Sequence, residues 1–139
     1  MILLDTSGLI AALSPVQRHH EAAAAALRNT DPPLILSPFV LAEMDDLLHE
    51  LAGVDASLRF LTEVTRRAYE LAAFGSGDIA RAGDVMAKHR DLEVGLADAS
   101  IVVLAERYGT RDLLSLDERR FRVLRPTPRG SFRILPADL

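Results

Sequence analysis

Four acidic side chains of this sequence are the candidates for a common catalytic or metal-binding role. They are Asp5, Glu43, Asp98 and Asp117, and each follows or begins a segment of marked apolar character. Carboxylates gathered in one place repel each other unless a cation neutralises them, and oxygen ligands of this kind suit Mg²⁺ or Mn²⁺. Such a cation lowers the pKa of a bound water and stabilises both oxygens of an in-line displacement at phosphorus. The chemistry that this set favours is phosphodiester hydrolysis, provided that the fold brings the four residues together.

The first acid follows a short apolar segment at the start of the chain. Residues 1–4 are all apolar and run directly into Asp5, which suits a strand buried on both faces of a parallel sheet. Asp5 then lies at the carboxyl end of that strand, where open α/β sheets bind their ligands. Asp117 repeats the pattern after residues 113–116, with Ser115 two positions before it. Taken alone, Asp117 is equally consistent with an Asp that starts a turn.

Glu43 lies on a predicted helix from Pro38 to about Leu51, with Ser37 as its N-cap and Gly53 at its end. At helical spacing, Glu43 lies on the border of an apolar stripe and is the acid of this helix that can face inward. The alternative is a border Glu that reaches water. The stripe consists of Val40, Met44, Leu47, Leu48 and Leu51.

Asp98 lies in the first turn of a strongly apolar predicted helix, Leu96–Tyr108, which Gly109 closes. It shares a face with Ile101, Val102 and Ala105. A carboxylate buried on such a face is costly unless it is paired, protonated or bound to a cation. The alternative is a role at the helix N-terminus, where the helix dipole favours negative charge.

The order of the predicted elements indicates the α/β class. Besides the N-terminal strand we expect strands at Leu34–Leu36, Tyr69–Leu71, Asp112–Leu116 and either Val123–Leu124 or Phe132–Leu135, with residues 126–130 as a rigid turn. The remaining helices are expected at Ser7–Leu13, Val16–Arg28, Asp55–Arg67 and Asp78–Arg90. The expected fold is a mostly parallel five-stranded sheet sandwiched by helices, in one domain over residues 1–139. All four acids then lie on one rim of the sheet.

The bulk composition narrows the class of protein. The 139 residues are 49% hydrophobic and 26% charged, as in ordinary soluble domains, and the lack of Cys excludes disulfides and thiolate metal sites. No apolar run approaches the roughly 18 residues of a membrane span and no signal peptide is recognisable, so a cytoplasmic location is expected.

The net charge of −4 argues against a dedicated nucleic-acid coat. Six Arg and three acidic residues lie between positions 117 and 139, and this basic segment is either a phosphate contact or a solvated loop.

Four short motifs surround the four acids in the order of the chain. They are Ile2–Gly8, Ser37–Glu43, Gly95–Ala99 with Leu104–Tyr108, and Leu114–Phe121. Together they resemble the motifs of the PIN-domain nucleases, and within them those of the VapC-type toxins of type II toxin–antitoxin pairs. The likeness covers the whole chain. It departs from the family at Ser115, where Thr is common, and at Glu93, where Pro is frequent, and neither change removes an acid.

The resemblance implies a Mg²⁺- or Mn²⁺-dependent endoribonuclease that cuts single-stranded or loop RNA and leaves a 5′-phosphate and a 3′-hydroxyl. It also implies a homodimer and a small antitoxin protein that covers the acidic cleft. The family carries its catalytic metal ligands at the positions of Asp5, Glu43, Asp98 and Asp117, and hydroxyls that orient them at those of Thr6 and Ser115. Arg119, Arg120 and Arg122 are candidates for contact with RNA phosphates, the alternatives being salt bridges to Glu118 or solvation.

Two other functions are compatible with these residues. One is a solitary PIN nuclease that acts on structured RNA or on DNA, and the other is a PIN-like binding module without catalysis. The intact acidic set argues against the binding module. A phosphatase with an aspartyl nucleophile is disfavoured, because it needs a second Asp at the position of Ser7.

Overall fold

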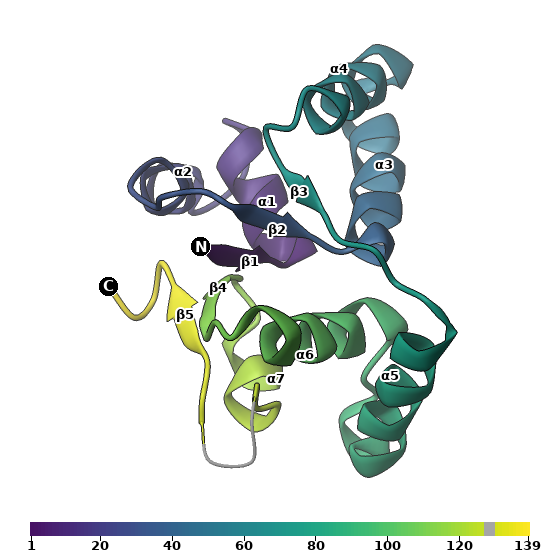
Figure 1. The fold of residues 1–139 in the computed structure, drawn as a ribbon. Helices are drawn as coiled ribbons and strands as arrows, with labels where there is room; N and C mark the ends of the chain where they lie inside the picture. Colours follow the sequence, from purple (N-terminus) through teal and green to yellow (C-terminus); the bar gives the residue numbers. More distant parts are fainter. Residues whose placement is uncertain (127–129) are drawn as a thin grey trace.

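A five-stranded sheet runs through the middle of the computed structural model, which describes residues 1–126 and 130–139 (Figure 1). The strands lie in the order β3-β2-β1-β4-β5, and every neighbouring pair is parallel. At the centre, Leu3 pairs with Ile35 on one side and with Leu113 on the other. The strands are β1 (Ile2–Leu4), β2 (Leu34–Leu36), β3 (Glu70–Leu71), β4 (Asp112–Leu114) and β5 (Arg133–Leu135).

Helices cover both faces of this sheet. In Figure 1 the first four helices lie in the upper half of the molecule and the last three in the lower half. This division follows from right-handed crossovers, because the chain steps from β1 to β3 in one direction and from β4 to β5 in the other. The helices are α1 (Thr6–Leu13), α2 (His20–Arg28), α3 (Pro38–Ala52), α4 (Val54–Thr65), α5 (Ser76–Lys88), α6 (Leu96–Tyr108) and α7 (Glu118–Val123), with a 3₁₀ turn, η1, at Arg90–Leu92. In the described part of the chain no helix is long and apolar enough to cross a membrane.

The predicted α/β sandwich is confirmed, and the sheet is parallel throughout. The bounds of α6 agree with the prediction, and Ser37 caps α3 by accepting a hydrogen bond from the Phe39 amide at 3.2 Å. Helix α2 begins only at His20, because residues 15–19 form turns. The strand considered at Val123–Leu124 is wrong, and the second alternative is correct, since β5 occupies residues 133–135. Residues 127–129 of the expected turn lie outside the described residues.

Helix α7 is the element that the prediction missed, and its start is visible in local chemistry. Asp117 is its N-cap, and Oδ1 of Asp117 accepts a hydrogen bond from the Arg120 amide at 3.1 Å. Such a cap satisfies one of the free amides of the first helical turn. The chain therefore turns into a helix directly after β4, which places Asp117 at the carboxyl end of the sheet.

The sheet order defines where a ligand site is expected. The chain leaves β1 toward β2 on one side, and β4 occupies the other side. The crevice outside the carboxyl ends of β1 and β4 is therefore the topological switch point of the fold, the usual ligand position in open α/β sheets. Asp5 follows β1 and Ser115 follows β4, so both lie at this crevice.

Candidate functional site

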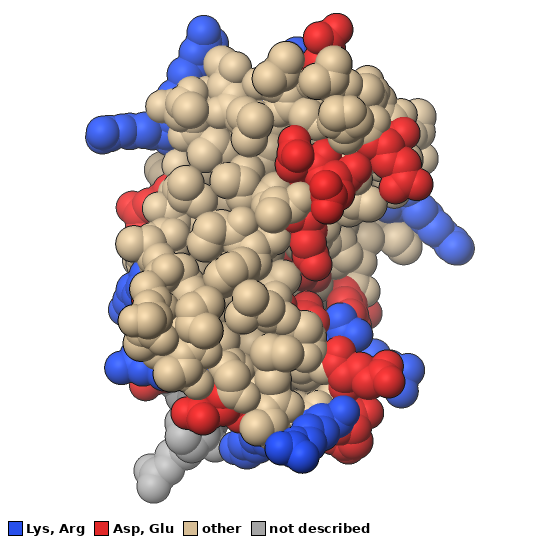
Figure 2. Space-filling model, turned by 90° about the vertical axis from the view of Figure 1, so that its right-hand side faces the viewer, with Lys and Arg blue, Asp and Glu red and all other residues tan. Residues whose placement is uncertain are grey.

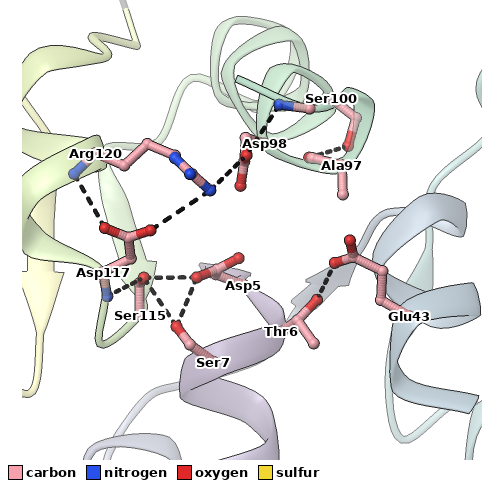
Figure 3. Close-up of polar contacts among 11 residues, drawn as sticks. Asp5, Thr6, Ser7, Glu43, Ala97, Asp98, Ser100, Ser115, Asp117 and Arg120 are labelled. Carbon is pink, nitrogen blue, oxygen red and sulfur yellow. Dashed lines mark hydrogen bonds and ion pairs between the residues drawn. The ribbon is translucent and has the colours of Figure 1, made fainter. Parts of the chain in front are cut away.

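Figure 3 shows that the four predicted acids point toward one another at the switch point. Asp5 is the N-cap of α1, Asp98 lies in the first turn of α6, and Asp117 is the N-cap of α7. Glu43 extends from the second turn of α3. Four different elements thus converge here, although within the described residues no three His, Cys, Asp or Glu side chains form a ready-made metal site. That these acids are metal ligands stays a prediction.

Asp5 is the most buried member of the cluster, with 6% of its surface exposed. Its Oδ2 accepts two short hydrogen bonds, from the Ser7 hydroxyl at 2.7 Å and from the Ser115 hydroxyl at 2.6 Å. Burial raises the pKa of Asp5 to about 6, and the two hydroxyls partly oppose this rise because they stabilise the ionised form. At neutral pH Asp5 is therefore ionised although its burial disfavours the charged form, and such perturbed groups are typical of functional sites.

Two backbone amides orient the serine hydroxyls. The Leu116 amide donates to Oγ of Ser7, and the Asp117 amide donates to Oγ of Ser115, each at 3.0 Å. A hydroxyl has a single proton, so each serine that accepts from an amide is left to donate that proton to Asp5. Ser115 was predicted to brace the site, whereas Ser7 was missed. The available signal was its position two residues after a strand-ending acid, the mirror of Ser115 before Asp117.

If the four acids hold a divalent cation, as the sequence predicts, replacement of Ser7 with Ala is expected to reduce the Mn²⁺ affinity by about tenfold, since groups that orient metal ligands have effects of this size. Unfolding should become easier by only about 1 kcal/mol, the typical value of one hydrogen bond. Calorimetric titration with Mn²⁺ and urea denaturation would separate the two effects. Ser7→Thr, which keeps the hydroxyl, should retain more affinity, and Ser76→Ala on the exposed start of α5 is the control. Wild-type affinity in Ser7→Ala would show that the hydroxyl does not position Asp5.

Asp98 and Asp117 are joined by one guanidinium group. Oδ2 of Asp98 accepts from the Gly95 amide at 3.2 Å and from Nη1 of Arg120 at 3.0 Å. The same Nη1 lies 3.6 Å from Oδ2 of Asp117. Burial raises the pKa of Asp98, which the Gly95 amide and Arg120 oppose and the nearby Glu43 and Asp117 reinforce. Asp98 does occupy a helix N-terminus and Asp117 does cap a helix, so these local roles coexist with their place in the cluster.

Glu43 closes the cluster on the side of α3. Its Oε1 accepts a hydrogen bond from the Thr6 hydroxyl at 2.6 Å, and its side chain is exposed. Val40 and Met44 are fully buried beneath it and fix the position of α3. Thr6 therefore braces Glu43 while Ser115 braces Asp5, so the two predicted hydroxyls serve different acids.

The three arginines considered as RNA contacts lie in three different surroundings. Arg120 is part of the acidic cluster, as described above. Arg122 binds both carboxylate oxygens of Asp138, at 2.6 and 2.7 Å, and Glu118 at 3.0 Å, so the salt-bridge alternative is correct for it. Arg119 is exposed and lines a hollow of about 250 Å³ next to Asp117. Asp91, Glu93 and Asp117 line the same hollow, so contact between Arg119 and an RNA phosphate stays a prediction.

One face of the molecule carries a band of negative charge (Figure 2). Figure 2 shows Asp and Glu side chains in a band across the face that carries α3 and α5, with Lys and Arg near its lower end and at the margins. An acidic band of this kind repels RNA phosphates. Binding of a polyanion over this face therefore requires that part of the negative charge be neutralised.

A parallel sheet of this order, with an acidic cluster at its switch point, defines an α/β protein with its ligand site outside the carboxyl ends of the strands. The family model of the PIN domain matches residues 2–125, and the chain belongs to that family. It is also 40% identical over 135 residues to Ribonuclease VapC26 of Mycobacterium tuberculosis, across 97% of this chain and 100% of that protein. This likeness places it among the VapC ribonucleases, a toxin family, and confirms the predicted resemblance.

Two solved structures share the fold. Mycobacterium tuberculosis VapC20, described as a sarcin-ricin loop cleaving toxin, superposes with a TM-score of 0.78 at 20% identity, over 84% of this chain and 90% of that chain. FitAcB from Neisseria gonorrhoeae gives a TM-score of 0.57 at 24% identity, over 81% of this chain and 88% of that chain. At these identities the two structures support the fold of the chain.

Proposed function

We propose that the protein is a Mg²⁺- or Mn²⁺-dependent endoribonuclease toxin that hydrolyses RNA phosphodiester bonds at its four-carboxylate site. The observation that carries this proposal is the convergence of Asp5, Glu43, Asp98 and Asp117 from four elements at the switch point of a VapC-family fold. Arg120 offsets only one of the four negative charges, and hard divalent cations prefer oxygen ligands.

The hydrogen bonds within the cluster support a cation site. The described hydroxyls, the Arg120 guanidinium and the Gly95 amide donate only to Oδ2 of Asp5, Oδ2 of Asp98 and Oε1 of Glu43. The second oxygen of each of these three carboxylates receives none of these bonds. Asp5 also accepts a hydrogen bond from the Thr6 amide. For Asp98 and Glu43, one oxygen therefore fixes the orientation of the side chain while the other is left for a cation, which is the arrangement expected of oriented ligands.

The cation would supply charge stabilisation to the phosphoryl group and lower the pKa of a water in the site. Asp5, Asp98 and Glu43 would hold it, and Asp117 would complete the set. Glu43, the exposed carboxylate of the cluster, is placed to orient the attacking water and accept its proton. The water oxygen bonds to phosphorus as the bond to the 3′ oxygen breaks, and that oxygen takes up a proton. The products are a 5′-phosphate and a 3′-hydroxyl.

A protein partner is part of the same proposal. Leucine and valine side chains of α3 and α4 are exposed, a feature that suits protein–protein contact. They are Leu51, Val54, Leu58 and Leu61. We propose that the chain forms a homodimer and that a small antitoxin neutralises it by covering the acidic cluster, as membership of a toxin family leads us to expect.

Purified protein incubated with single-stranded RNA is expected to cleave it when Mg²⁺ or Mn²⁺ is added, and to stop when chelator is in excess. Duplex RNA and DNA of the same sequence serve as parallel substrates. Sequencing of the 5′ ends of cellular RNAs after brief expression would then identify the target. Cleavage that persists in chelator would contradict the metal dependence, and preferential cleavage of DNA or structured RNA would indicate a solitary PIN nuclease.

A further inference from the structure

Arg120 is the basic side chain that balances the acidic cluster. Among the described residues it is the only Lys, Arg or His that forms a salt bridge with any of the four acids. Its Nη1 bridges Asp98 on α6 and Asp117 on α7, two carboxylates that otherwise repel each other. The side chain of Asp98 is 14% exposed, whereas those of Arg120 and Asp117 are 33% and 36% exposed, so the contact is only partly shielded from solvent.

Asp117 differs from the other three acids in how its oxygens are used. Its Oδ1 accepts from the Arg120 amide, and its Oδ2 faces the Arg120 guanidinium. Both oxygens are thus directed to the same residue, whereas Glu43 and Asp98 each keep an oxygen clear of the donors described above. A cation that uses Oδ2 of Asp117 as a ligand lies next to the Arg120 guanidinium, and the two positive charges compete for that carboxylate.

We propose that Arg120 is a built-in counter-ion of the acidic cluster, which holds Asp98 and Asp117 together without a metal and competes with the divalent cation for Asp117. The inference rests on the proposed metal site and goes beyond it, since it assigns control of the metal affinity to one side chain. Once displaced, the guanidinium is next to the cluster and available to an RNA phosphate.

The test is calorimetric titration of the full chain with Mn²⁺, together with thermal unfolding in chelator and in saturating Mn²⁺. Arg120→Gln removes the charge and keeps much of the length of the side chain. It is expected to bind Mn²⁺ about tenfold more tightly, to melt at lower temperature in chelator, and to gain more stability from Mn²⁺ than the wild type. Arg120→Lys keeps the charge and should stay close to wild type.

Arg119→Gln is the matched control, because it removes the same charge at the neighbouring position. In the described structure the Arg119 side chain forms no salt bridge with a carboxylate. Its Mn²⁺ affinity should stay within about twofold of that of wild type. The difference between these two affinities gives the long-range effect of removing one positive charge. Equal or weaker binding in Arg120→Gln than in Arg119→Gln would overturn the counter-ion role and would make Arg120 a support of the metal ligands. If neither wild type nor Arg120→Gln binds Mn²⁺, the proposed metal site itself fails, and the counter-ion role with it.

Discussion

Replacement of Asp5 with Asn is expected to reduce RNA cleavage by at least about a thousandfold, because charge stabilisation by a bound cation is worth several kcal/mol and each 1.36 kcal/mol is a factor of ten. Asn has the same shape and can still accept the hydrogen bonds of Ser7 and Ser115 through its carbonyl oxygen. The loss therefore tests the carboxylate charge and not the packing. Single-turnover cleavage of a labelled RNA in saturating Mn²⁺ is the measurement.

The same substitution should leave the fold as stable as wild type or more stable at neutral pH. Burial raises the pKa of Asp5 to about 6, above its ordinary value of 3.8. An acid with a raised pKa in the folded state contributes most stability below pH 3.8, and this contribution is lost as the pH rises through about 6. The asparagine side chain does not titrate. The melting temperature of Asp5→Asn in chelator, compared with that of wild type at the same pH, should therefore increase as the pH rises from 3.8 to about 6 and change little above that.

Asp84→Asn is the control for both measurements, since Asp84 is exposed on α5 and away from the cluster. It should cleave RNA as the wild type does and show the same pH dependence of melting. A variant Asp5→Asn that keeps more than a tenth of wild-type cleavage would contradict the role of Asp5. Loss of activity accompanied by unfolding at every pH would show that Asp5 is structural.

Gly8→Ala is expected to destabilise the protein by at least about 2 kcal/mol, through overpacking against backbone. A Cβ at Gly8 would lie 2.5 Å from the carbonyl carbon and oxygen of Leu114 and 2.7 Å from the Ser115 amide nitrogen. Main-chain atoms of the central sheet cannot move aside as a flexible side chain does. Helix α1 would have to withdraw from β4, which would also separate Ser7 from the Leu116 amide that orients it.

Urea denaturation followed by far-ultraviolet circular dichroism measures this effect, and cleavage should fall with it. Gly83→Ala is the matched control, because Gly83 lies inside α5 and a Cβ there meets nothing within 4 Å. That substitution should stabilise the protein by about 0.5–1 kcal/mol, the usual gain when Ala replaces Gly in a helix. Equal midpoints for the two variants would show that the close approach of α1 to β4 is not required.

Much of the frame of the site was predictable because its parts are local. Apolar residues 1–4 followed by Asp5 indicated a buried strand with an acid at its end, and the structure places both there. The start of α3 followed from the Ser37-Pro38 pair and the bounds of α6 from its apolar content and Gly109. Helix α7 was missed because its six residues lie between two apolar segments, and a short helix shows too few turns for its period to be recognised.

The sequence alone determined which acids belong together, since a parallel sheet collects the carboxyl ends of its strands at one rim. The tertiary structure decided how each acid is held. Ser7 is oriented by an amide 109 positions away along the chain, and Asp5 accepts from a hydroxyl 110 positions away. The placement of Arg120 between Asp98 and Asp117 depends on how α6 meets α7. Local patterns specify strands, caps and the faces of helices, but hydrogen bonds and ion pairs between distant segments depend on the packing of whole elements.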